Sequence, residues 1–135
     1  MDIDNRSQDA QSIGYLVVRV STARGAIPLA DAAVSIRGST PESSGIIYSL
    51  STNSDGLTEK ISLPAPPRSA SQSPGDPAPY SLWNIDVFRD GYIPVSYQNV
   101  PVYSSIVSVQ PAVMIPIAEN FYSEPIFNES ENPNL

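Results

Sequence analysis

The chain has 135 residues and a net charge of −7, and it contains neither Cys nor His. This length suits one domain with a single core. The two missing residue types exclude disulfides, thiolate or imidazole metal sites, and catalytic triads or dyads built on His or Cys. The seven basic residues are scattered along an acidic chain, so no basic patch is expected and nucleic acid is not an expected partner.

Residues 1–12 are polar, lack an apolar period and are predicted to form a flexible leader. They contain no apolar core of a secretory signal. No later stretch approaches the roughly 18 apolar residues of a membrane-spanning helix. The sequence therefore predicts a cytoplasmic chain without a membrane span.

The first two strands are predicted from alternating side chains. Residues 14–22 and 33–38 show the period of two that places one apolar set on a single sheet face. Gly, Pro and Asp between the two stretches mark a connection. The side chains predicted to face the core are Leu16, Val18, Val20, Val34 and Ile36.

A turn at Asn53–Gly56 separates the next two predicted strands. Residues 46–52 form the third strand, without a clear buried face, and residues 57–63 form the fourth. Asp-Gly readily supplies the positive backbone angles of a tight turn, so we expect a β-hairpin here. The oxygens of Asn53 and Asp55 are chemically suited to Ca²⁺, but the further acidic ligands of a calcium loop are missing and the turn is the favoured interpretation.

Residues 64–79 contain six Pro, too many for pairing in a sheet, and the segment is long for a loop without structure. Proline lowers the entropy of the unfolded chain and so reduces the cost of fixing one conformation. We predict that this loop is ordered by packing against the domain.

The stretch 80–88 holds the only Trp of the chain and is predicted to be a central strand. Its alternation places Trp83, Ile85 and Val87 toward the core, and we expect the ring N–H of Trp83 to bond to the backbone. Asp90-Gly91 then marks a turn, and a second strand folds back beside the first.

Asp86 and Asp90 lie near the end of this central strand. Two close carboxylates can divide the roles of acid and base. A solvated strand face and a turn cap account for these two equally well, so no catalytic residue is predicted.

Residues 107–117 are predicted to form the last strand, and residues 118–135 an acidic tail. The tail combines four Glu with large apolar side chains, more than a purely solvating tail carries. We predict a partner-seeking segment that adds to a sheet edge, anchored by Phe121 and Tyr122.

About seven short strands separated by turn signals, without a helical apolar stripe, predict an all-β domain over residues 13–117. The predicted architecture is an antiparallel sandwich of two sheets.

Three turn and strand motifs resemble those of one family. Residues 25–36, Gly-Ala-Ile-Pro-Leu-Ala-Asp-Ala-Ala-Val-Ser-Ile, resemble the opening of carboxypeptidase-regulatory-like, or transthyretin-like, domains. Residues 52–56 resemble the T-D-x-x-G hairpin of that family. Residues 83–87, followed by Gly91-Tyr92, are similar to its Y-x-V-x-V-x-x-x-G-Y strand. The resemblance implies a seven-stranded Greek-key sandwich.

A narrower resemblance concerns bacterial surface proteins. Residues 63–66 (Leu-Pro-Ala-Pro), 100–103 (Val-Pro-Val-Tyr) and 114–117 (Met-Ile-Pro-Ile) are similar to segments of a small domain that precedes peptidoglycan-binding or spore-cortex-lytic modules in spore-forming bacteria. That domain is an accessory, so the resemblance implies association with the cell wall or spore.

The expected function is that of a scaffold or interaction module, not an enzyme, which presents sheet edges and the loop 64–79 to a protein or cell-wall partner. No cofactor and no metal are expected. The alternative is a module that binds carbohydrate or peptidoglycan through exposed Tyr side chains on one outer sheet face. The residues predicted to contact a partner are Tyr15, Tyr48, Tyr97, Tyr103, Phe121 and Tyr122.

Overall fold

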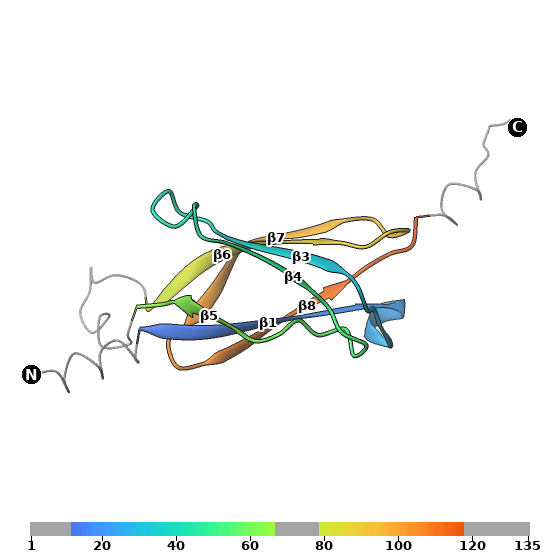
Figure 1. Cartoon of the computed structure of the whole chain (residues 1–135), viewed down its shortest axis with the longest axis horizontal. Coiled ribbons are helices and arrows are strands. Elements are labelled where there is room, and N and C mark those ends of the chain that lie inside the picture. Colours follow the sequence, from blue (N-terminus) through green and yellow to red (C-terminus); the bar gives the residue numbers. More distant parts are fainter. Residues whose placement is uncertain (1–11, 67–78, 118–135) are drawn as a thin grey trace, which may run out of the picture.

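The computed structural model of the chain describes residues 12–66 and 79–117, which form two β-sheets packed face to face (Figure 1). The predicted all-β sandwich is thereby confirmed. The one helical element within these residues is a 3-10 turn, η1, at Ala23–Gly25, and no helix there is long and apolar enough to cross a membrane. The strands are β1 Ile13–Thr22, β2 Ile27–Pro28, β3 Ala33–Gly38, β4 Ile47–Ser51, β5 Ile61–Pro64, β6 Tyr80–Phe88, β7 Val95–Tyr103 and β8 Val107–Val113.

Strand β1 is the centre of the first sheet. Residues 107–113 of β8 pair in parallel with residues 15–21 along one edge of β1. On the other edge, β5 pairs with the first part of β1 and β2 with its last two residues, both antiparallel. The alternation of β1 buries Leu16, Val18 and Val20 completely, as predicted.

The second sheet has the strand order β4-β3-β6-β7, and all its neighbouring strands are antiparallel. Strand β6 lies between β3 and β7, which confirms the predicted central strand. The turn before β7 contains Gly91 at φ +86°, a conformation that glycine adopts without strain. Pro94 directly precedes β7, where a missing N–H costs no ladder bond. Val34 and Ile36 of β3 are buried, as predicted.

Two details of the predicted topology are wrong. Strand β8 runs parallel to β1, so the sandwich is not purely antiparallel. The described residues also form eight strands rather than seven, because the short β2 pairs with β1 where a plain connection was expected. Alternation specifies which face of a strand is buried but not which strand lies beside it. Strand β2 has only two residues, which are too few to show an alternating pattern in the sequence.

The turn at Asn53–Gly56 joins the two sheets and does not close the predicted hairpin. Strand β4, which precedes it, belongs to the second sheet, whereas Leu57 after it bridges to Arg19 in the first. Gly56 has φ +77°, and a Cβ atom there would lie 2.3 Å from the carbonyl oxygen of Val20. Glycine is therefore required at this crossing both by its backbone angle and by the close approach of β1.

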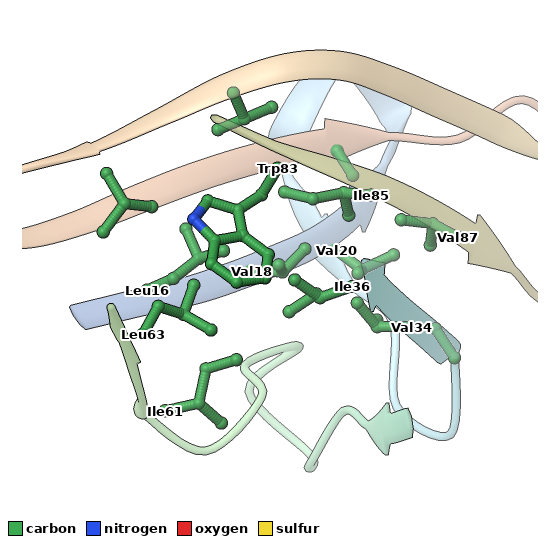
Figure 2. Packing of buried hydrophobic residues seen from close by; sticks show 14 of the residues in the cluster. Leu16, Val18, Val20, Val34, Ile36, Ile61, Leu63, Trp83, Ile85 and Val87 are labelled. Carbon is green, nitrogen blue, oxygen red and sulfur yellow. The ribbon is translucent and has the colours of Figure 1, made fainter. Parts of the chain in front are cut away.

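The core lies between the two sheets, with Trp83 in its middle (Figure 2). Trp83, Ile85 and Val87 are all at most 1% exposed, which confirms their predicted burial. The predicted backbone partner of the Trp83 ring is wrong. Its Nε1–H donates to the Ser81 hydroxyl at 2.7 Å, and that hydroxyl donates to the Pro64 carbonyl at 2.6 Å.

Three predicted segments lie mainly outside the described residues. These are the leader 1–12 except for Ser12, the loop 64–79 except for its two ends, and the tail 118–135 with Phe121 and Tyr122. At the start of the loop, Ala65 is buried and its N–H donates to the carbonyl of Ser12 at 2.8 Å.

Candidate functional site

Strand β8 is an edge strand, and β1 is its one strand partner in the described part of the chain. The N–H of Tyr15 donates to the carbonyl of Ile106 at 3.0 Å, and the N–H of Met114 donates to the carbonyl of Ser21 at 2.8 Å. Backbone groups of successive strand residues point to opposite edges, so the even-numbered residues of β8 face β1. The backbone N–H and C=O groups of its odd-numbered residues therefore point to the free edge.

The outer face of the first sheet carries a row of exposed apolar side chains along β8. Val107, Val109 and Val113 are 49%, 52% and 42% exposed, and Pro111 between them is also exposed. The half-buried Val17 of β1 lies beside Val109. Single exposed apolar residues are common on protein surfaces, but a continuous row along one strand is a mark of an interaction site. We call these five side chains the valine face.

Two cationic side chains border the valine face. Arg19 is exposed and lies beside Pro111 across the β1–β8 ladder. The Nζ of Lys60 lies 4.9 Å from the ring centroid of Tyr15, which is the β1 neighbour of Val107. A Lys at this distance from an aromatic ring is attracted to its electron-rich face. A chain with a net charge of −7 thus places two positive charges next to its exposed apolar row.

A groove of about 240 Å³ separates β8 from β7, the edge strand of the second sheet. Val109 lines one side, Pro101 and Tyr103 line the other, and none of the residues around it is charged. The Tyr103 ring packs edge-on against the Tyr80 ring, with centroids 5.5 Å apart and planes at 63°. The groove therefore extends the valine face toward the second sheet.

The free edge of β8 is partly protected against pairing with other strands. Pro111 faces that edge and has no N–H to donate, and its carbonyl accepts a hydrogen bond of 2.8 Å from the Gln110 side chain. Proline is a common guard on edge strands for this reason. Main-chain pairing is thereby confined mainly to Val107 and Val109, and longer contacts must rely on side chains.

The structure separates the four Tyr that were predicted to contact a partner. Tyr15 lies on the outer face of the first sheet, and Tyr103 lies in the β7–β8 groove. Tyr48 and Tyr97 are half-buried against the core, and the Tyr48 hydroxyl donates to the carbonyl of Ser62 at 3.4 Å. The four side chains do not share one outer face.

The polar candidates of the sequence serve the fold. The Asn53 Oδ1 accepts hydrogen bonds from the turn itself, including one of 2.9 Å from the N–H of Asp55. Asp86 accepts a hydrogen bond from the hydroxyl of Ser96 on the neighbouring strand, while Asp90 lies in the turn after β6. In the described ranges no three acidic side chains gather as metal ligands.

Sequence reasoning missed the valine face, although its signal is present. Residues 107–110 alternate, with Val107 and Val109 separated by the polar Ser108 and Gln110, and the usual interpretation would bury the valines. The structure does the reverse. The side chains of Ala112 and Met114 are buried, so the even-numbered residues of β8 face the core. The valines, at odd-numbered positions, therefore face outward.

No family model matches the chain, and no curated protein matches it by sequence. Its fold is similar to part of the Bacillus anthracis TIE protein (TM-score 0.54, 13% identity, 78% of this chain and 17% of that chain). It is similar to 3-chlorocatechol 1,2-dioxygenase from Rhodococcus opacus (0.54, 12%, 78% and 61%). It is also similar to catechol 1,2-dioxygenase from an Acinetobacter species, solved with mercury bound as an inhibitor (0.55, 10%, 90% and 58%).

The chain spans less than two thirds of the length of each of these neighbours, and at such identities the likeness shows the fold alone. It nevertheless contradicts the prediction that the chain is not an enzyme, since two of these neighbours are dioxygenases. The physical reason is that a fold only positions side chains and loops, and one framework serves both catalysis and binding.

Proposed function

We propose that the chain is an interaction module that docks an extended segment of a partner protein on β8. The observation that carries this proposal is the valine face, with three valines of β8 between 42% and 52% exposed on a strand that has one free edge. An extended segment on such an edge gains main-chain hydrogen bonds and covers alternate side chains at the same time.

The energetics favour a contact made mainly by side chains. Covering a half-exposed valine removes apolar surface worth about 1 kcal/mol. The unprotected backbone groups at Val107 and Val109 add direction and register, while Pro111 limits the length of the ladder. A moderate, reversible affinity follows.

A protein partner is favoured over a sugar partner. Sugar rings stack on aromatic side chains that form one platform, whereas Tyr15 lies on the outer face of the first sheet, Tyr103 lies in the groove, and Tyr48 and Tyr97 pack against the core. The uncharged groove beside Val109, which has both apolar and polar lining residues, suits an extended peptide better.

The setting of this module is proposed to be the bacterial cell wall or spore cortex. The support is the resemblance of residues 63–66, 100–103 and 114–117 to an accessory domain of cortex-lytic and peptidoglycan-binding proteins. The transthyretin-like Greek-key description belongs to the same proposal. Co-sedimentation with purified peptidoglycan separates the two candidate functions, since binding to bare glycan would indicate the carbohydrate alternative and no binding would fit a protein partner in the same setting.

Selection of extended peptides from a random library against the full-length chain tests the docking itself. We expect selected peptides to bind the parent and to lose about tenfold in affinity with Val109→Lys, which places a charge within the covered surface. Ile47→Lys is the matched control, because Ile47 is 57% exposed on β4, an edge strand of the other sheet. Failure to select any peptide even against the variant Phe121→Ser/Tyr122→Ser, which removes the predicted anchors of the tail, or equal loss with Val109→Lys and Ile47→Lys, overturns the proposal.

A further inference from the structure

We propose that the ligand of the valine face is an acidic segment with aromatic side chains, and that residues 118–135 of the same molecule are such a ligand. This inference rests on the proposed function of β8 and names the chemistry of its partner. The occupant is the tail of the same molecule and not a second copy of the chain.

Charge complementarity is the first argument. Arg19 and Lys60 border the valine face. Residues 118–135 contain four Glu and no Lys or Arg. Opposite charges at the rim of an apolar contact steer a segment onto its surface and fix its register.

Apolar complementarity is the second argument. The same segment contains Phe121, Tyr122, Ile126 and Phe127 among its acidic residues. Large side chains on an extended segment need apolar surface to cover, and the row of exposed valines along β8 provides it. A segment of acidic residues alone would not match this row.

The reach of the tail is the third argument. The N–H of Ile117 donates to the carbonyl of Gly91 at 2.9 Å, which fixes the start of the tail four residues after the end of β8 at Val113. An extended chain advances about 3.3 Å per residue, so Phe121 and Tyr122 reach about 15 Å from this point and the whole tail about 60 Å. Strand β8 is about 23 Å long and ends at Val113, so the first aromatic pair reaches the Val113 end of the strand and not Val107 at the other end.

Connection within one chain favours the same molecule over a second copy. A short flexible tether gives its end an effective concentration in the millimolar range. At micromolar protein, a second copy competes poorly with a tethered segment of equal chemistry. Pro125 interrupts the segment after its first aromatic pair, so the main contact is expected from residues 119–124.

Amide hydrogen exchange on the full-length protein tests this inference. The N–H of Val113 points to the free edge at the end of β8 nearest the tail, so a docked tail slows its exchange. We expect the double variant Phe121→Ser/Tyr122→Ser to raise the exchange rate of this amide about tenfold. Ile47→Ser is the control, since Ile47 is 57% exposed on β4, at the edge of the second sheet opposite β7.

A charge variant gives an independent readout. Arg19→Glu is expected to speed exchange at Val113, whereas Arg37→Glu, which changes an exposed Arg on the second sheet, should not. Equal exchange in the parent and the double variant overturns the inference. Protection that grows with protein concentration also overturns it, because the occupant is then a second copy.

The two proposals fail in different ways. If the tail does not dock, the β8 amides exchange at the same rate in all variants, yet selected peptides still bind and still lose affinity with Val109→Lys. If the proposed function is wrong, no selected peptide binds β8 even after Phe121→Ser/Tyr122→Ser has removed the competing tail.

Discussion

At the scale of single residues, one hydrogen-bond chain joins the two sheets beside the core. Trp83 of β6 donates to Ser81 of the same strand, and Ser81 donates to the carbonyl of Pro64 at the end of β5. The burial of Trp83 was predictable because alternation is a local property of the sequence. Its hydroxyl partner was not, because the approach of Pro64 depends on how the two sheets pack together.

Ser81→Ala tests this chain of bonds. The substitution leaves the buried Trp83 N–H without its acceptor, which costs about 1 to 3 kcal/mol of unfolding free energy. Urea denaturation measures the change. Ser96→Ala, which removes an exposed hydroxyl bound to Asp86, is the control and should cost much less. Equal costs for the two variants would contradict the structural role of Ser81.

Trp83→Ala tests the packing of the ring itself. Trp83 is 1% exposed, so truncation removes its burial and leaves a cavity, at a cost of about 3 to 5 kcal/mol. This is a large share of the stability of a small domain. A thermal melting curve within a degree or two of the parent would show that the ring is not part of the core.

At the scale of elements, strand β8 shows what a sequence pattern leaves open. Its alternation was visible, and its position as the last strand was predicted correctly, but its parallel partner and the outward direction of its valines were not. The strand partner and the outward direction of the valines are both set at the corner between β7 and β8, where the chain passes from one sheet to the other. Which strand pairs there, and which face of it is buried, depend on contacts distant in sequence.

Gly14→Ala tests how β1 is held against this corner. Gly14 bridges to Ser104, and a Cβ atom on it would lie 2.4 Å from the carbonyl oxygen of Tyr103. Because backbone must move to make room, we expect a loss of about 1 to 3 kcal/mol in unfolding free energy. Gly45→Ala is the matched control, since nothing lies within 4 Å of the added atom there. Equal stability of both variants in urea would contradict the close approach.

Pro111→Ala tests whether proline guards the free edge of β8. The substitution supplies an N–H at the position where the ladder is interrupted, so we expect stronger self-association in sedimentation velocity. Adding Val109→Lys to the same protein should reverse the effect by placing a charge in the contact. An unchanged sedimentation coefficient for Pro111→Ala would show that the edge is protected by other means.

At the scale of the whole molecule, local signals were enough to predict the class but not the connections. Strand periods and turn residues specified two apolar faces and hence a sandwich. The crossing at Asn53–Gly56 looked like a hairpin because turn chemistry is the same whether the chain returns to its own sheet or enters the other one. The candidate site was predictable to the same extent. Tyr103 was predicted as a contact residue because it is aromatic, whereas the exposure of the valines depends on the three-dimensional packing of β8.

Repulsion between negatively charged copies opposes contact between their valine faces, and this opposition leads to a prediction about salt. Copies with a charge of −7 repel one another, and this repulsion opposes contacts between their exposed apolar rows. Raising the salt concentration from 0.1 M to 1 M shortens the Debye length from about 10 Å to about 3 Å. The same screening weakens the attraction of an acidic tail to Arg19 and Lys60, which frees the valine face. Salt therefore both exposes this surface and reduces the repulsion between copies. We therefore expect self-association to increase with salt in sedimentation equilibrium, to be lost with Val109→Lys and to persist with Ile47→Lys. Association that decreases with salt, or that depends on Ile47 instead, would show that another surface joins the copies.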